Sequence, residues 1–272
     1  MSAGQLTPPE DPLARWAFDY VSTTSLAHKL APPPLPREAS DGVVPLRLDA
    51  PGRPRELRVT WDKYKAPRSA GALRDPKKRA HLLHTFFHHE LQAAELMAWA
   101  VLAFPETPLA FRRGLLRISL DEVRHMNAYA VHIATLGFAV GDFPVRDWFW
   151  QRAPSACTPL AFLATMSLGF EAGNLDHSER YVELFTEAGD LEAARLQHVV
   201  GAEERAHVAF GAHWFRAFAG TLSFARWVEA LPAPLSPMVM RGKPVARLAR
   251  EAAGFDPTFL DELEAWQPRS PG

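Results

Sequence analysis

Hydrophobic and polar positions repeat at helical spacing through four long segments, each bounded by residues that start or stop helices. The pattern predicts helices over 75–104, 107–137, 158–189 and 190–220. Each begins at an Asp or Thr that can cap a helix, three of the four caps are followed by proline, and three of the four ends are glycine. At about 1.5 Å rise per residue, each helix would be on the order of 42 to 46 Å long.

Short connections join the first helix to the second and the third to the fourth, so each pair is predicted to form an antiparallel hairpin. A crossover of about twenty residues, 138–157, separates the second helix from the third. It contains the strings GDFP at 141–144 and WFW at 148–150, and we expect its aromatic side chains to cover apolar surface as the chain passes along the bundle. The sequence therefore predicts an all-α fold, a four-helix bundle with a long crossover between helices two and three.

The segments outside the bundle differ in composition. Eleven of the 24 prolines lie in residues 1–74, where Asp11-Pro12 is predicted to open a helix to about Leu30, and 46–61 to form a small β-hairpin. Two shorter apolar segments, 222–231 and 245–255, predict accessory helices near the C-terminal end. We therefore divide the chain into a proline-rich N-terminal extension (1–74), the bundle (75–220) and short C-terminal helices (221–272).

Two copies of the pattern Glu-x-x-His lie inside the predicted helices, Glu122 to His125 and Glu204 to His207. Residues three apart share one face of a helix, so each pair can offer a carboxylate oxygen and an imidazole nitrogen to a common point. A single match of this kind often arises by chance. Two matches, each on the second helix of a predicted hairpin, are much rarer.

The first helix of each hairpin has a glutamate at the corresponding position. Glu90 precedes Glu122 by 32 residues, and Glu171 precedes Glu204 by 33. The offsets between the two halves, 81 for the first glutamate and 82 for the second, predict an internal duplication. Because all four glutamates lie 13 to 15 residues from the caps of their helices, we expect them to meet at one level near the bundle centre.

Metal binding is the interpretation that the apolar surroundings favour. Four carboxylates in an apolar interior would repel one another and cost several kcal/mol each to desolvate. Two divalent cations would neutralise them, and mixed oxygen and nitrogen ligands suit iron or manganese. The alternative, exposed acids and histidines on amphipathic helices, is disfavoured by neighbours such as Phe87, Ile118 and Leu168. The predicted cofactor is a pair of metal ions, Fe/Fe or Mn/Fe, held by Glu90, Glu122, His125, Glu171, Glu204 and His207.

Other polar residues near these positions are weaker ligand candidates. Glu95 and Asp176 recur five residues after Glu90 and Glu171, which turns them about 140° away from the ligand face. Three histidines on the first predicted helix could add a ligand or relay protons, although helical histidines usually pack or face solvent; they are His84, His88 and His89.

Composition and charge limit the binding partners and the cellular location that we expect for this protein. Thirty basic residues balance thirty-one acidic ones, so no nucleic-acid or membrane surface is indicated. The longest uninterrupted apolar stretch, 96–104, is nine residues, far short of the roughly 18 that span a bilayer, and residues 1–12 lack the apolar run of a signal sequence. A single cysteine, Cys157, excludes an intrachain disulfide. We expect a cytoplasmic protein, monomeric or homodimeric.

The chain resembles the ferritin-like superfamily and, more closely, a bacterial ferritin-like family that carries a domain-of-unknown-function label. The resemblance spans about 74–214 and, more loosely, the proline-rich start, and it lies in the strings LLHTFFHHELQAAELMAWA, FRRGLLRISLDEVRHM, GDFPVRDWFW, LGFEAGNLDH and EERAHVAFG. It implies a di-metal bundle. It implies no substrate, because relatives of this fold include oxygenases, a tRNA hydroxylase, ferroxidases and radical-generating subunits.

Three further residues are similar to functional residues of di-iron enzymes. Asp121 and Glu203, which precede the motif glutamates, resemble carboxylates that orient metal-bound histidine, with a surface acid as the alternative. Tyr129, four residues after His125, has the place of the radical tyrosine in the small subunit of ribonucleotide reductase, with a buried structural tyrosine as the alternative.

The leading functional hypothesis is a di-iron oxygenase or oxidase, which would use dioxygen and an unidentified electron donor to oxidise or hydroxylate a small organic substrate. An alternative of a different class is a ferroxidase or iron-storage protein without an organic substrate. The two histidines argue against storage, since storage sites are richer in carboxylate. A bundle that has lost its metal is a third alternative, which metal analysis would identify.

Overall fold

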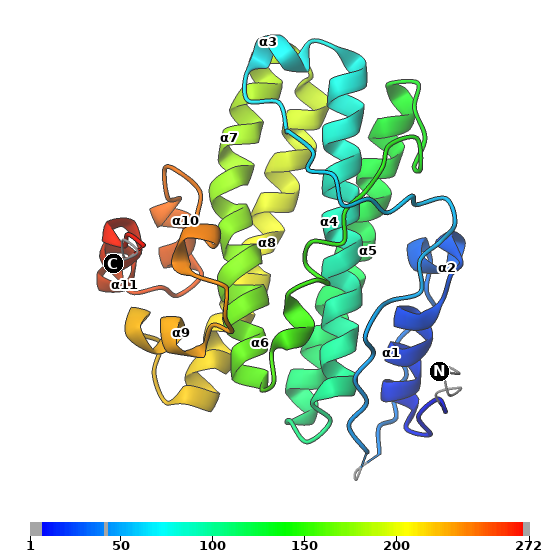
Figure 1. The fold of residues 1–272 in the computed structure, drawn as a ribbon, viewed down its shortest axis with the longest axis vertical. Helices are drawn as coiled ribbons and strands as arrows, with labels where there is room; N and C mark the ends of the chain where they lie inside the picture. The colour runs from blue at the N-terminus through cyan, green and yellow to red at the C-terminus, as the bar shows by residue number, and fades with distance from the viewer. Residues whose placement is uncertain (1–6, 41–42, 269–272) are drawn as a thin grey trace. The chain divides into compact units, whose positions relative to one another are not determined.

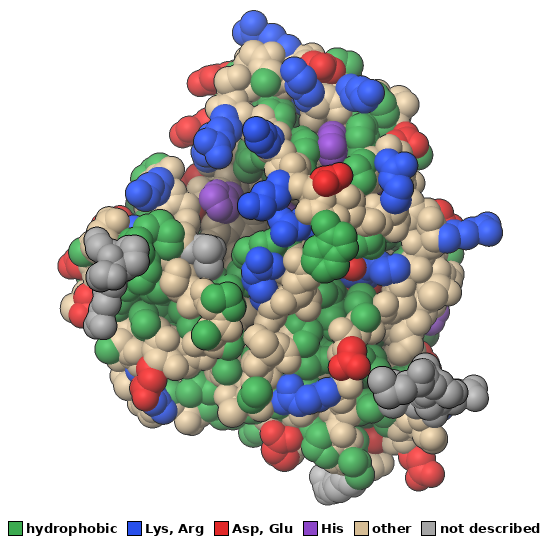
Figure 2. Space-filling model, in the orientation of Figure 1, with side chains coloured by type: hydrophobic (Ala, Val, Ile, Leu, Met, Phe, Trp, Pro, Cys, Tyr) green, Lys and Arg blue, Asp and Glu red, His purple; other side chains and the backbone are tan. Residues whose placement is uncertain are grey.

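The computed structural model describes residues 7–40 and 43–268, and within those ranges every regular element is a helix (Figure 1). A single isolated bridge pairs Val59 with Val145. This confirms the predicted all-helical class and is consistent with a helical bundle. Among the residues described, no helix combines the length and the apolar character that crossing a membrane requires. Figure 2 shows basic and acidic side chains spread among hydrophobic ones on the face drawn.

The chain forms two compact units. The first comprises Met1–Lys63, His84–Ile133 and Phe138–Gln151. The second comprises Tyr64–Leu83, Ala134–Gly137 and Arg152–Gly272.

The first unit is built on an antiparallel helical hairpin. Its helices are α1 (Pro12–Ser22), α2 (Leu26–Leu30), α4 (Pro76–Ala103), which enters this unit at His84, and α5 (Leu109–Thr135). The Phe86 and Tyr129 rings lie 5.8 Å apart, and further along the hairpin the Ser119 hydroxyl donates to the Ala94 carbonyl at 2.9 Å. From the first contact to the second, residue numbers increase on α4 and decrease on α5, so the two helices run antiparallel.

The second unit contains the other long hairpin. Its helices are α3 (Ala70–Leu73), α6 (Pro159–Thr165), the π-helix η2 (Met166–Glu171), α7 (Ala172–Ala188), α8 (Leu191–Ala219), α9 (Phe224–Ala230), α10 (Arg247–Ala252) and α11 (Pro257–Ala265), with short 3-10 turns η1 (Ala153–Ser155) and η3 (Pro237–Val239). The segments α6, η2 and α7 follow one another without a break, and α7 lies beside α8 (Figure 1). Gln197 on α8 donates to the Ser178 hydroxyl on α7 at 3.1 Å.

Most predicted helix boundaries are confirmed because the residues that predicted them act as caps. The Thr158 hydroxyl accepts from the Ala161 N–H at 3.1 Å, and the Asp190 carboxylate accepts from the Ala193 N–H at 3.0 Å. Gly189 ends α7 with φ of 86°, a left-handed conformation that favours glycine. The accessory helices predicted near 222–231 and 245–255 correspond to α9 and α10, and α11 follows them.

The single helix predicted to run from Asp11 to Leu30 is instead two helices. Ser25 starts the second one, since its hydroxyl accepts from the His28 N–H at 3.2 Å. The end of the first helix is occupied by another segment, because Gly52 donates its N–H to the Val21 carbonyl at 2.8 Å. A side chain at position 52 would clash with the Ser22 carbonyl, so only glycine permits this approach.

The β-hairpin predicted over residues 46–61 is wrong. One local turn bond joins the Leu57 N–H to the Pro54 carbonyl, but no pair of strands forms among these described residues, and the other backbone groups of the segment that bond do so to the rest of the unit. Leu46 donates its N–H to the Leu102 carbonyl at the end of α4, at 2.9 Å, and Thr60 donates to the Val145 carbonyl in the crossover, at 2.8 Å. Of the alternating apolar residues, Leu48 and Leu57 are buried, whereas Val59 and Trp61 are exposed, so the alternation does not mark one face of a strand.

A buried carboxylate attaches this N-terminal segment to α4. Glu95 is fully buried and lies 2.7 Å from the Lys29 ammonium and 2.5 Å from the Arg53 guanidinium. The Trp150 indole N–H also donates to Glu95, at 2.8 Å. Burial alone would raise the pKa of Glu95, but the two cations lower it, so the group is ionised in the fold.

The same network continues to the crossover. Arg53 also contacts Asp147 at 2.9 Å, and His88 contacts the same carboxylate at 2.8 Å. Although burial opposes ionisation, His88 and Arg53 lower the pKa of Asp147 to about 2. The N-terminal segment and the crossover are thus attached to α4 through one set of charges.

In the second unit, Asp176 has the corresponding role. The Arg250 guanidinium donates to both of its carboxylate oxygens, at 2.9 and 2.7 Å. The backbone N–H groups of Gly242 and Ala246 add bonds of 2.7 and 2.8 Å. Glu95 and Asp176, the weaker ligand candidates of the two halves, therefore each bind a segment that lies outside the hairpins.

Replacing Glu95 by glutamine should strongly destabilise the fold. The change would leave Lys29 and Arg53 beside a neutral amide, and breaking a buried ion pair costs about 3 to 5 kcal/mol of unfolding free energy. Urea denaturation would measure it. Asp19→Asn is the matched control, because the Arg15–Asp19 pair is about half exposed and such pairs contribute roughly 1 kcal/mol or less. Similar losses in both variants would contradict the assigned role of Glu95.

The Asp147 network predicts a specific loss of stability in acid. Because folding lowers the pKa of Asp147 from 3.8 to about 2, its ionised form stabilises the fold fully above about pH 4, and this contribution is lost as the pH falls towards 2. The difference in unfolding free energy between the wild type and Asp147→Asn should therefore shrink over that range. Urea midpoints at several pH values would measure it, and a difference independent of pH would contradict the prediction.

Candidate metal centre

In the first unit, the structure brings together three of the predicted ligands. Glu90 lies on α4, and Glu122 and His125 lie on α5, three residues apart and therefore on one face of that helix. Candidate ligand atoms of the three side chains all lie within 4.8 Å of one another, and each residue is at most 5 % exposed. This group is called the first cluster below.

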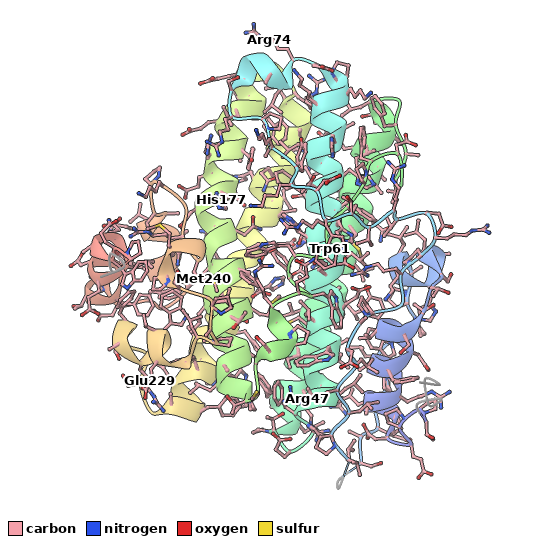
Figure 3. The ribbon with its side chains drawn as sticks, in the orientation of Figure 1. Arg47, Trp61, Arg74, His177, Glu229 and Met240 are labelled. Carbon is pink, nitrogen blue, oxygen red and sulfur yellow. The ribbon has the colours of Figure 1, made fainter. Side chains whose placement is uncertain are left out.

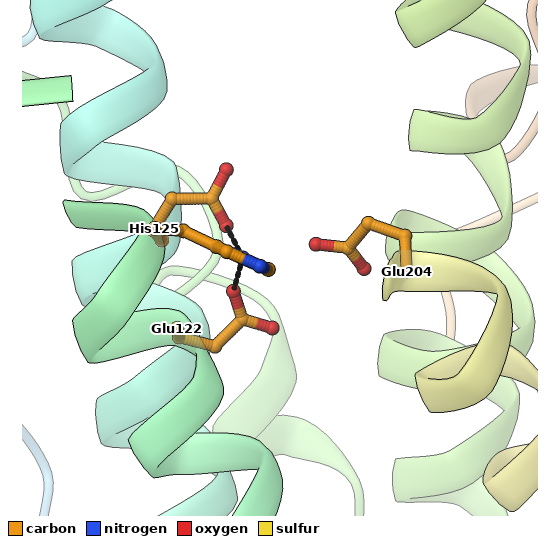
Figure 4. Close-up of side chains that lie close together, drawn as sticks. Glu122, His125 and Glu204 are labelled. Carbon is orange, nitrogen blue, oxygen red and sulfur yellow. Dashed lines mark hydrogen bonds and ion pairs between the residues drawn. The ribbon is translucent and has the colours of Figure 1, made fainter. Parts of the chain in front are cut away.

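The imidazole of His125 lies between the two carboxylates of the first cluster. Its Nδ1 atom is 3.0 Å from Glu122 Oε2 and 3.9 Å from Glu90 Oε2, and Figure 4 shows the ring beside Glu122. Burial opposes a charge on the ring, yet hydrogen bonds with Glu122 and Glu90 raise the pKa of His125 to about 12. The carboxylates therefore strongly favour a positive charge at this position, which a proton or a metal ion can supply.

In the second unit, the other three predicted ligands form a matching group. Glu171 is the last residue of η2, and Glu204 (labelled in Figure 4) and His207 lie on α8. His207 Nδ1 is 3.4 Å from Glu204 Oε2, and ligand atoms of Glu171 and His207 lie within 4.8 Å of each other. All three residues are at most 5 % exposed. This group is called the second cluster.

Each cluster fits a divalent cation by its chemistry. Two carboxylates and one imidazole are the oxygen and nitrogen donors that iron, manganese and similar ions accept, and two carboxylates neutralise one doubly charged ion. Buried glutamate and histidine side chains in both units could therefore bind metal. The donor set does not distinguish one such metal from another.

The remaining candidates lie elsewhere on the same helices. Tyr129 is buried on α5, where its ring packs near Phe86. Asp121 forms an ion pair with Arg124 at 2.5 Å, and both side chains are more than one third exposed. Glu203 is half-buried on α8. The roles predicted for Tyr129, Asp121 and Glu203 stay predictions.

Three histidines of α4 contact the crossover. The Gly141 N–H donates to His84 Nε2 at 2.8 Å, and His88 pairs with Asp147. The third ring, that of His89, stacks on Phe149 with ring centroids 5.0 Å apart. Each histidine therefore contacts a crossover residue. This agrees with the packing role that the sequence analysis weighed against a role as ligand or proton relay.

The π-helix that ends at Glu171 is a feature that the sequence analysis did not predict. Its wider turn accommodates one more residue than an α-turn, and such turns are frequent at functional sites. The available signal was Gly169, which lies in the interior of a predicted long helix although glycine disfavours α-helix.

The comparisons with known proteins are consistent with a family whose activity is not defined. The chain is similar to an uncharacterized protein of Haemophilus influenzae, with 28 % identity over 160 residues. That alignment covers 56 % of this chain and 54 % of the relative, so it spans about half the length of the curated protein. No solved structure matches.

A family model described as "Protein of unknown function (DUF455)" matches residues 14–261. The match includes both hairpins, both clusters and the two segments anchored by Glu95 and Asp176. Because it covers most of the 272 residues, the chain belongs to the DUF455 family of proteins of unknown function.

Proposed function

We propose that the two hairpins form a ferritin-like four-helix bundle in which the first and second clusters share one dinuclear centre. The observation that supports this most directly is the repetition of one donor set, a glutamate plus Glu-x-x-His, buried in each hairpin. A ferritin-like bundle places those two sets opposite each other around two metal ions.

We further propose that the centre contains iron, or manganese and iron, and that the protein is an oxygen-activating oxidoreductase with a small organic substrate. When bound, two ferrous ions would supply the electrons that reduce dioxygen. The carboxylates of Glu90, Glu122, Glu171 and Glu204 would hold the ions, and the two histidines would complete their coordination.

The surroundings of the clusters support an oxidative role. Phe87 and Leu91 on α4 and Leu168 on η2 are completely buried. Apolar residues of this kind exclude water and offer few groups that an oxidant would attack. Neutral imidazole ligands distinguish both clusters from carboxylate-only sites, which favours oxygen chemistry over iron storage.

Metal content is the first test of the proposal. Protein loaded anaerobically with Fe(II) should bind two ions per chain, measured by elemental analysis after removal of loosely bound iron. Glu122→Ala and Glu204→Ala should each remove at least one ion, because each deletes a carboxylate from one cluster. Glu192→Ala is the matched control on α8, since Glu192 is exposed and pairs with Arg195. Less than about one ion per chain in the wild type, unchanged by these variants, would disprove the metal centre.

Oxygen reactivity distinguishes an oxidoreductase from an iron-storage protein. The ferrous-loaded protein should consume dioxygen with a change in its optical spectrum, while native mass measurements give a monomer or a dimer. Ferroxidase and storage activity would instead accumulate many ferric ions per chain in a large assembly. An oxygen electrode together with native mass spectrometry would decide between the two outcomes, and a large iron-filled assembly would contradict the proposal.

A further inference from the structure

The metal candidate Glu171 lies at the junction between the π-helix η2 and the α-helix α7. The N–H of Ala172 donates to the Ser167 carbonyl, five residues earlier, which is the hydrogen bond of a π-turn. If η2 tightened to α-helix, α7 would change register by one residue against the preceding chain. That is a rotation of about 100° and a shift of about 1.5 Å. The direction of Glu171 therefore depends on what holds this register.

Asp176 is the residue of α7 that is held most firmly. It lies five residues after Glu171, on the α-helix that continues η2 without a break, and it is 5 % exposed. It accepts two bonds from Arg250 and two from the backbone of residues 242 and 246. Arg250, itself 1 % exposed, also donates to the Met240 carbonyl at 3.2 Å. Residues 240–250, called the clasp below, thus fix the rotation of α7 through one buried carboxylate.

The clasp also covers the outer side of the π-turn. Met240, labelled in Figure 3, is completely buried, and a Cβ atom at Gly169 would lie only 2.6 Å from its sulfur. One turn later, a Cβ atom at Gly173 would lie 3.3 Å from the Met240 carbonyl oxygen. Met240 therefore packs directly on the backbone of η2 and of the start of α7.

The inner side of the π-turn is fitted to α8 in the same way. Ser167 faces Gly211, where a Cβ atom would lie 2.2 Å from the Ser167 Cβ. Gly211 follows His207 by four residues, and Ser167 precedes Glu171 by four, so this contact lies about one helical turn from the second cluster. The π-turn is thus enclosed by α8 on one side and by the clasp on the other.

We propose that Arg250 and Met240 are positioning residues for Glu171, which act by fixing the rotational register of α7 and the π-turn before it. This inference rests on the proposed function in one respect, that Glu171 is a metal ligand. Arg250 sets the rotation through Asp176, and Met240 packs closely on the backbone of the π-turn and of the start of α7. Neither residue contacts the metal.

Hydrogen exchange tests the register without any metal. In Arg250→Met, amides of 166–172 should exchange at least about tenfold faster than in the wild type, while those in the middle of α8 keep their protection. Met240→Ala should have the same local effect, and it leaves every charge of the clasp in place should Arg250→Met fold poorly. Arg247→Met is the matched control, because Arg247 belongs to α10 but forms only partly exposed ion pairs with Asp261 and Glu264. Unchanged exchange in 166–172 in Met240→Ala would overturn the proposal.

Cobalt titration tests the link to Glu171. Co(II) should bind to Met240→Ala about 10- to 100-fold more weakly at one of two sites, the usual effect of losing a group that orients a metal ligand. In a Glu171→Gln background, the Met240→Ala change should have no further effect on Co(II) affinity, since the clasp acts through that carboxylate. An equal loss in that background would overturn the positioning role. Absence of Co(II) binding by the wild type would refute the proposed function, while the exchange measurement would still decide whether the clasp fixes the π-turn.

Discussion

The need of each buried carboxylate for a positive partner is the constraint on which the other contacts of this protein depend. An ionised carboxylate removed from water without such a partner costs several kcal/mol. Glu95 is neutralised by Lys29 and Arg53, and Asp176 by Arg250. The first cluster is different, because two carboxylates face a single imidazole. Even with a proton on His125, that cluster carries a net negative charge, which a divalent cation would remove.

The same constraint explains why the flanking segments accompany the hairpins. Lys29 and Arg53 come from the N-terminal segment, and Arg250 comes from the C-terminal one. Each supplies charge to a carboxylate five residues after a candidate ligand. Without these segments, Glu95 and Asp176 would be exposed to water or left unpaired in an apolar environment. Each flanking segment therefore belongs to the same unit as the hairpin that it contacts, and the family match extends over both segments.

Much of the fold could be predicted because its signals are local. Thr158, Asp190 and Gly189 mark helix ends through their own hydrogen bonds or backbone angles, so they can be recognised without tertiary information. The grouping of Glu122 with His125 likewise follows from the helical repeat. The sharing of one centre by the two clusters stays a prediction, because local signals within one hairpin do not place it against the other.

The features that could not be predicted depend on contacts distant in sequence. The segment 46–61 alternates like a strand, but its partners distant in sequence are on α1, on α4 and in the crossover. The π-turn depends on Met240, about seventy residues later, and on Gly211 in the next helix. The partners of Glu95 and Asp176 also lie far away along the chain. No local pattern specifies such pairings, so periodicity places Glu95 and Asp176 on helices without indicating what they bind.

The five-residue spacing between the two kinds of carboxylate has a mechanical consequence. Five residues turn an α-helix by about 500°, so Glu171 and Asp176 point about 140° apart while they share one rigid rod. One helix can then face a cluster with its first carboxylate and a flanking segment with its second. Because the rod does not twist easily, a bond that fixes Asp176 also fixes the direction of Glu171. Glu90 and Glu95 repeat this arrangement in the other hairpin, where Lys29 and Arg53 take the place of Arg250. The predicted duplication would thus preserve the candidate ligands together with the carboxylates that anchor their helices.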